Sequence, residues 1–455
     1  MFFGSEAKSL MRLALPIAMS QLIIIGMGIT DVIVAGRAGT VELAGMTLGS
    51  NVTHIIIYSF FAIGFAAAPL VSRHFGAGRL NEMASQIQQV LWTCLFVGIL
   101  CMIFIYCASQ LLVRANFDPE IQRIAASYTA VMALSGFVLC MVAGLRSSLE
   151  SMTWTVPVLI VNLLAFLINI PLDIILVHGY LGAPRLGSVG CAVATVAIQS
   201  FIMLSFFVCL WLALKKQHIP LKNNFETANK AEIFKIIKLG FPMGLSVLIE
   251  MGFFSGAAVM IVYFGAVNAG AHAVAIAAAS ATYMIYHGLS QAITIRSSHY
   301  LGRDQYQQAR DTCHTGVKIG MLAACICSVI FILFRHDIVS LFSNDPEVIA
   351  LAATLLIFSA IFQFADAMQV TAMYGLRAYL DTRSPLVIQF IGFWVVAAPL
   401  GYILSKNSYY PILNGAFGYW IAMCIGLSIV AIILMKKLLT TARDYPHSST
   451  TQLEI

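Results

Sequence analysis

Long apolar stretches without a charged side chain recur along this chain. Three of them are Leu43–Ser72, Leu186–Leu214 and Asn407–Met435. A membrane-spanning helix needs about 20 mostly apolar residues, because each residue adds about 1.5 Å across a hydrocarbon core of about 30 Å. These stretches and the polar breaks between them predict an all-α integral membrane protein with twelve transmembrane helices, near residues 11–36, 46–72, 88–112, 125–145, 155–178, 189–213, 239–264, 271–295, 317–334, 350–376, 385–405 and 414–435.

One long polar segment, Lys215–Lys238, divides the predicted helices six and six. The first half recurs in the second at a nearly constant distance of 226–231 positions: Pro16 with Pro242, Ser20 with Ser246, Val41 with Val267, Ser72 with Ser298, Gly76 with Gly302, the Asp-Pro-Glu triplets at 118 and 345, the Gly-Leu-Arg triplets at 144 and 375, and Pro157 with Pro385. An even number of helices in each half makes both repeats cross the membrane in the same direction. This predicts a pseudo-two-fold axis along the membrane normal, with alternating access by rocking of two lobes. A repeat kept only for packing is the alternative.

The predicted organisation has an N-terminal lobe (1–214), a cytoplasmic linker (215–238), a C-terminal lobe (239–437) and a cytoplasmic tail (438–455). The basic residues orient it. Of the 26 Lys and Arg, 20 fall on the side that holds both termini and 6 on the other. Because basic residues concentrate in cytoplasmic loops, both termini are predicted to be cytoplasmic.

Composition excludes a soluble protein. Of the 455 residues, 60% are hydrophobic and only 10% charged, whereas a soluble domain carries about 25% charged residues. The net charge of +6 is not gathered into a basic patch with interleaved aromatics, so no nucleic-acid partner is expected. The ten cysteines form no CxxC pair and no Cys/His metal spacing, and no cofactor is expected.

Four of the 20 acidic residues fall within predicted spans: Asp31, Asp173, Glu250 and Asp366. An ionised carboxylate at the bilayer centre costs at least ~2.5–3.5 kcal/mol. Each must therefore be protonated, paired or hydrated, and no Lys or Arg is predicted mid-span to pair with it. Such carboxyl groups can exchange a proton or bind a cation, as ion coupling requires. The alternative is a protonated residue that only packs.

The depths of these residues predict one cation or proton site in each lobe. Asp31 and Asp173 lie equally deep, and Asn169 precedes Asp173 by one helical turn and can contribute an amide oxygen. The two aspartates, if they face each other, cannot both be ionised without a counter-ion. Glu250 and Asp366 lie near the midplane and are candidate ligands for sodium.

Four uncharged polar residues within the spans are candidate residues of a substrate cavity. Helix–helix hydrogen bonds explain the uncharged ones equally well. The 20 Met, 29 Phe and 16 Tyr suit an adaptable cavity for cationic or aromatic small molecules. The candidates are Asn162, Thr195, Gln363 and Gln369.

Five segments resemble transporters of the multidrug and toxic-compound extrusion (MATE) family, most closely the NorM-type branch. They are LPIAMSQLIIIGMGITDVIVAGRAG, SRHFGAGR, NIPLDIILVHG with GSVGCAVAT, LGFPMGLSVLIEMGFFS and FADAMQVTAMYGLRAY. The resemblance covers essentially the whole chain. It implies a fold of two six-helix lobes and export of organic cations in exchange for sodium or protons. It also implies that Asp31, Glu250 and Asp366 serve coupling and substrate binding.

One position departs from the family pattern. NorM-type relatives commonly have Asn where this chain has Asp173. An Asp at this position, with Asn169 and Asp31, is similar to the DinF-type site linked to proton coupling. The coupling ion, sodium or proton, therefore stays open.

The function expected from these observations is secondary active multidrug export by a monomer in the bacterial inner membrane. The alternative is a lipid-precursor or lipid-linked oligosaccharide flippase of the same superfamily. Such flippases tend to line their cavity with Arg or Lys, and none is predicted mid-span here. An ATP-driven pump lacks support because no GxxxxGK[ST] motif occurs. Without HExxH, GxSxG or clustered His, an enzyme is not expected either.

Overall fold

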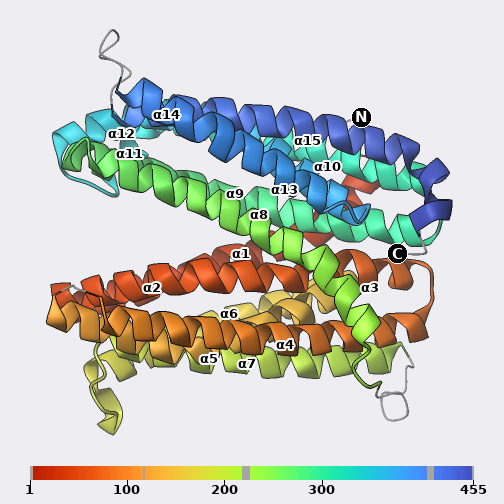
Figure 1. Ribbon diagram of the computed structural model, residues 1–455, viewed down its shortest axis with the longest axis horizontal. Helices are drawn as coiled ribbons and strands as arrows, with labels where there is room; N and C mark the ends of the chain where they lie inside the picture. The colour runs from red at the N-terminus through yellow and green to blue at the C-terminus, as the bar shows by residue number, and fades with distance from the viewer. Residues whose placement is uncertain (1–3, 116–117, 218–225, 407–414, 453–455) are drawn as a thin grey trace. The chain divides into compact units, whose positions relative to one another are not determined.

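A computed structural model describes residues 4–115, 118–217, 226–406 and 415–452, with side chains up to residue 445. In this part of the chain every regular element is helical (Figure 1). The α-helices are α1 (Ser5–Ala38), α2 (Thr40–Phe61), α3 (Ala67–Gly76), α4 (Leu80–Val113), α5 (Pro119–Ser151), α6 (Thr155–His178), α7 (Ser188–Lys216), α8 (Lys230–Val262), α9 (Ala266–Gly302), α10 (Tyr306–Leu333), α11 (Arg335–Ser340), α12 (Pro346–Ala378), α13 (Arg383–Phe390), α14 (Ala398–Ser405) and α15 (Ala416–Gln452).

Within the described residues, twelve helical segments are long and apolar enough to cross a membrane. Two of them are composite. The 3-10 turn Ala62–Ala66 joins α2 to α3, and the π-helix Ile391–Ala397 joins α13 to α14. The predicted all-α class and the number of spans are confirmed.

Several helices are longer than the predicted spans. The segment predicted at 125–145 belongs to α5, which ends at Ser151, and the one predicted at 350–376 belongs to α12, which ends at Ala378. The apolar pattern locates the part that crosses hydrocarbon, whereas backbone hydrogen bonding continues through polar residues beyond it. As a result Arg146 and Arg377 lie inside helices, and they are only 2% and 4% exposed.

The repeated Asp-Pro-Glu triplets begin helices. Asp118 accepts hydrogen bonds from the backbone N–H groups of Glu120 at 3.0 Å and Ile121 at 3.3 Å, at the start of α5. Asp345 accepts one from Glu347 at 2.9 Å, at the start of α12. A proline at the first helical position leaves no N–H to satisfy there. The same capping device therefore starts the fourth span of each half.

The chain divides into two compact units, residues Met19–Gly244 and residues Met1–Ala18 with Leu245–Ile455. Figure 1 shows long helices side by side within each, such as α4, α5 and α7 in the first. Both dividing points fall inside a helix, in α1 and in α8. The predicted lobes, 1–214 and 239–437, stay a prediction, because a unit defined by packing need not be the body that moves.

Polar contacts hold the first turns of α1 in the unit that contains α9 and α10. The Glu6 carboxylate accepts hydrogen bonds from Arg296 Nη2 at 2.7 Å, from the Tyr300 hydroxyl at 3.0 Å and from Thr312 Oγ1 at 2.8 Å. Pro16 follows ten residues later inside α1. An internal proline removes one backbone hydrogen bond and weakens the helix. The weak point thus lies two residues before α1 passes from one unit to the other at Ala18.

The start of α8 is held in the other unit in a similar way. Gln89 of α4, only 2% exposed, accepts a hydrogen bond from the Asn229 backbone N–H at 2.9 Å and donates to the Thr227 carbonyl at 3.1 Å. Pro242 lies inside α8, two residues before its dividing point at Gly244. Each unit therefore packs the first part of the helix that opens the other half of the sequence.

A glycine permits the tightest packing of α1 in its unit. A Cβ atom at Gly288 of α9 would lie 2.6 Å from the backbone N and Cα of Ala18. We expect Gly288→Ala to destabilise the protein by about 1–3 kcal/mol, because backbone atoms must move to make room. Gly256→Ala is the matched control, since nothing lies within 4 Å of a Cβ at this helical position. Thermal unfolding in detergent measures both, and equal midpoints would contradict the packing described.

Candidate functional site

The carboxyl groups predicted in the N-terminal half come together inside one unit. Asp31 lies near the end of α1, and Asp173 lies on α6 and is 0% exposed. Their carboxyl groups interact directly, and the Asn169 side chain lies beside both. Thr195 of α7 donates its hydroxyl to Asp31 Oδ2 at 3.2 Å. Three helices thus supply these four predicted residues to one site, which we call the N-terminal acidic site.

The acceptors of the N-terminal acidic site outnumber its donors. No N–H or O–H group of the described residues is aligned with Asp31 Oδ1 or with either oxygen of Asp173. Two carboxylates in contact in a low-dielectric site repel each other strongly. Either one of them holds a proton, or a cation lies between them. The arrangement is therefore suited to take up and release one positive charge as a unit.

Asn162, a predicted substrate residue, lies two turns before Asn169 on α6 and is 2% exposed. Its Nδ2 has no acceptor among the described residues. An amide donor without a partner in an apolar interior is costly. The structure places this donor on the helix that carries Asp173, and its role in substrate binding stays a prediction.

The C-terminal half has a second acidic site, centred on Glu250 of α8. Gln369 of α12 donates its Nε2 to Glu250 Oε1 at 3.3 Å, and Gln389 of α13 donates its Nε2 to Glu250 Oε2 at 3.2 Å. Both glutamines are 0% exposed, and neither side-chain oxygen has a donor among the described residues. Two amide oxygens without a donor therefore lie beside a carboxylate, as in a site for a hard cation.

Asp366 completes this C-terminal acidic site from α12, where it is 4% exposed. It interacts electrostatically with Glu250. Gln363, one turn earlier, has a different environment, since its Oε1 accepts hydrogen bonds from the Tyr286 hydroxyl at 2.8 Å and from Thr282 Oγ1 at 2.9 Å. The structure therefore joins Glu250, Asp366 and Gln369, but it directs the oxygen of Gln363 toward α9.

Two residues of this site were missed by sequence reasoning. Gln389 is one of several polar residues in apolar segments, and only the fold shows that it reaches Glu250. Arg377 was assigned to a cytoplasmic loop, yet it lies buried in α12 and interacts electrostatically with Glu250. Arg377 lies at the end of α12 and not in the middle of the span, yet its charge acts on Glu250.

Aromatic rings pack together about one helical turn beyond Glu250 on α8. Phe253 stacks on Phe393 with ring centroids 5.1 Å apart, and Phe254 meets Phe362 edge to face at 6.0 Å. Phe362 also contacts the ring of Trp420 at 6.1 Å. Aromatic faces attract cations, and their apolar area suits planar organic molecules.

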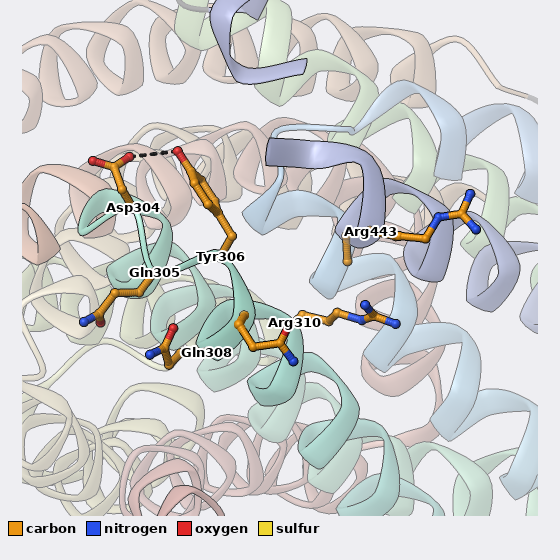
Figure 2. A pocket seen from close by; sticks show the side chains of 8 residues that line it. Asp304, Gln305, Tyr306, Gln308, Arg310 and Arg443 are labelled. Carbon is orange, nitrogen blue, oxygen red and sulfur yellow. Dashed lines mark hydrogen bonds between the residues drawn. The ribbon is translucent and has the colours of Figure 1, made fainter. Parts of the chain in front are cut away.

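A hollow on the surface belongs to the unit that contains α9 and α10. It has a volume of about 470 Å³ and lies beside the start of α10 and the end of the described part of α15. Figure 2 shows Arg310 and Arg443 among the residues that line it, with Tyr306 donating to Asp304 at 3.0 Å. It contains none of the predicted site residues, so the chemistry of this protein is to be sought at the buried carboxylates.

Comparison with protein families gives a double match. The MatE family model matches residues 16–175 and again residues 242–403. The two matches begin 226 positions apart, the offset that relates Pro16 to Pro242. The internal repeat predicted from the sequence is thereby confirmed.

Relatives match over nearly the full length. The chain is 32% identical over 444 residues to the multidrug resistance protein MdtK of Photorhabdus laumondii, with 96% of each chain covered. It is also 32% identical over 438 residues to the protein of that name from Yersinia enterocolitica, covering 95% of each.

Among solved structures, a MATE protein in complex with MaL6 superposes with a TM-score of 0.87 at 18% identity, covering 97% of both chains. An outward-facing multidrug resistance MATE family transporter superposes with a TM-score of 0.85 at 19% identity, covering 97% of this chain and 96% of the other. At such low identity these two structures support the fold. With the family model and the full-length relatives, they identify the chain as a multi-pass membrane protein that belongs to the MATE family of transporters.

Proposed function

We propose that this protein is a secondary active exporter that moves organic cations out of the cytoplasm in exchange for sodium or protons. The observation that carries the proposal is the C-terminal acidic site. This site contains Glu250 and Asp366. It also contains the side-chain oxygens of Gln369 and Gln389, which are buried and have no donor among the described residues. A site with this excess of oxygen acceptors gains stability when a cation or proton enters it.

A sodium ion in the C-terminal acidic site would depend on these oxygens. The described residues contain no group of three or more His, Cys, Asp or Glu side chains able to hold a metal ion. Sodium, however, accepts neutral oxygen ligands, and Glu250 and Asp366 with the Gln369 and Gln389 oxygens would supply four side chains. A proton on either carboxyl group would neutralise the same charge.

The N-terminal acidic site supports the same proposal by a different route. Asp31 and Asp173 share one low-dielectric environment, and Asn169 can hydrogen-bond whichever aspartate is protonated. Uptake of a proton from the outer side would neutralise the pair, and its loss would accompany rearrangement toward drug uptake. A sodium ion bridging the two carboxylates is the alternative at this site.

The nature of the exported molecules follows from charge and aromatic surface. Two acidic sites favour cationic molecules, and the cluster formed by the rings of Phe253, Phe254, Phe362 and Phe393 begins one helical turn after Glu250 on α8. The full-length relatives bear the name multidrug resistance protein, which agrees with export of several drugs. A flippase for lipid-linked sugars is less favoured, because it needs cations that face phosphates and both sites hold more acidic than basic groups.

Inside-out vesicles test the proposal directly. When sodium or protons are loaded into the vesicle lumen, we expect the fluorescent cation ethidium to accumulate inside without ATP, because outward flow of the loaded ion drives inward antiport. An ionophore that dissipates the gradient should abolish accumulation, and empty vesicles are the control. Ethidium uptake that depends on neither gradient would overturn the proposal.

The same vesicles test the proposed orientation, with both termini and the segment 215–238 in the cytoplasm. Protease added outside should cut this segment in inside-out vesicles and spare it in right-side-out ones. The opposite pattern would reverse the direction of transport.

A further inference from the structure

Two buried arginines occupy equivalent positions of the repeat, and their surroundings differ. Arg146 and Arg377 each follow the same Gly-Leu pair, 231 positions apart. Each has an acidic residue four positions later, Glu150 in the first half and Asp381 in the second. At this spacing a helix places the two side chains on one face, where an ion pair can form.

In the first half this ion pair forms. Arg146 Nε donates to Glu150 Oε1 at 2.7 Å, and the two side chains are 2% and 1% exposed. A buried guanidinium and the carboxylate bonded to it form a pair without net charge, and such a pair acts only weakly on groups farther away. Arg146 therefore leaves Asp31 and Asp173 without a compensating positive charge.

In the second half the pair does not form. Asp381 instead accepts a hydrogen bond from the Ser384 backbone N–H at 3.0 Å and lies 3.8 Å from Lys437 Nζ. The Arg377 guanidinium lies 3.9 Å from the centroid of the Tyr374 ring and donates to Met373 Sδ at 3.7 Å. A buried guanidinium against a ring and a thioether still carries its full charge, which needs an anion at longer range.

The C-terminal acidic site supplies such an anion. Arg377 and Asp366 lie eleven residues apart on α12, which places them on nearly the same face of the helix about three turns apart. Arg377 interacts electrostatically with Glu250, and both are within electrostatic range of Tyr283. With both carboxylates ionised, Glu250, Asp366 and Arg377 together carry one net negative charge.

Resting on the proposed function, we infer that Arg377 is a fixed counter-charge of the C-terminal acidic site, so that a single monovalent cation neutralises the site. Arg377 is a positioning residue in this scheme and does not touch the ion. It stabilises the empty site after the cation leaves, and it weakens cation binding enough to permit release. Without it the empty site would hold two uncompensated negative charges in a low-dielectric environment.

Radioactive sodium binding to the purified protein, at alkaline pH and without drug, tests the inference. A fixed unit charge within about 10 Å of an ion, at an effective dielectric constant of about 20, changes its affinity about tenfold. We therefore expect Arg377→Gln to lower the half-saturating sodium concentration about tenfold, and Arg377→Lys to stay within about threefold of the unsubstituted protein. The double variant Arg146→Gln, Glu150→Gln is the matched control and should leave sodium binding unchanged.

A rescue experiment separates the charge of Arg377 from its packing. Asp366→Asn makes the site neutral when empty, so sodium binding should be lost. Adding Arg377→Gln to Asp366→Asn restores one net negative charge, and sodium binding should return. This double variant also serves if Arg377→Gln alone does not fold, because its site has the charge of the unsubstituted protein.

The outcomes separate this inference from the proposed function. Unchanged sodium affinity in folded Arg377→Gln, or no recovery in the double variant, would mean that Arg377 only packs against Tyr374. Absence of sodium binding by the unsubstituted protein would overturn the inference and the sodium form of the proposed function. Proton-driven ethidium uptake would then still stand as a separate measurement of export.

Discussion

Glu250→Gln is expected to abolish cation-driven drug efflux while the protein still reaches the membrane. Glutamine keeps the volume and can still bond to Gln369 and Gln389, but it removes the charge that holds the cation. Removing one charged partner from a buried site costs about 3–5 kcal/mol, or about two to four orders of magnitude in affinity. Drug resistance of cells and ethidium uptake by inside-out vesicles both measure the loss.

The matched control for this variant is Glu347→Gln. Glu347 lies in the exposed first turn of α12, outside both acidic sites, and its substitution should leave transport unchanged. Asp366→Asn should reproduce the loss seen with Glu250→Gln, since both carboxylates belong to one site. Full drug resistance in both variants would show that the C-terminal acidic site has no part in coupling.

Asp173→Asn is expected to weaken proton-driven efflux strongly and sodium-driven efflux less. The substitution keeps the volume almost unchanged and removes one of the two carboxyl groups of the N-terminal acidic site. Asp31 then lies next to two amides and no second carboxylate. Without repulsion between two carboxylates, the site binds a proton less tightly. We expect proton-driven uptake to fall by about tenfold or more, as for the loss of one strong charge interaction of about 1.4 kcal/mol or more.

Two gradients applied separately to the same vesicles make this measurement. Asp118→Asn is the control in the same unit, because asparagine caps a helix as well as aspartate does. If Asp173→Asn transports normally under a pure pH gradient, Asp173 has only a structural role and coupling depends on the other three carboxylates.

The spans and the acidic residues within them could be predicted from the sequence, because the lipid bilayer constrains both. A helix needs a long apolar stretch to cross lipid, and a carboxylate within such a stretch is rare because it is costly there. The equal depth of Asp31 and Asp173 also followed, whereas only the packed structure shows that the two side chains meet. The spans and the depths need only helical geometry and the direction of each span.

Other features required the packed structure. Gln389 reaches Glu250 from α13, and no local pattern distinguishes it from the other intramembrane amides. Arg377 was counted with the loops, because span prediction stops where the first charge appears, although the helix and the protein interior continue past it. The two acidic sites are only partly equivalent in the repeat. Both take residues from the first and fifth spans of their halves, but the N-terminal site adds the sixth span, α7, and the C-terminal site adds the fourth, α12.

The attachment of Glu6 to Arg296 has a consequence for how the protein is made. The two residues are 290 positions apart. At a synthesis rate of about 5–20 residues per second, Glu6 leaves the ribosome about 15–60 s before its partner. Residues Met19–Gly244 are complete once the ribosome has passed α8, whereas the other unit needs both ends of the chain. During synthesis the beginning of α1 must therefore remain in the membrane without its final neighbours, and the unit it belongs to becomes complete last.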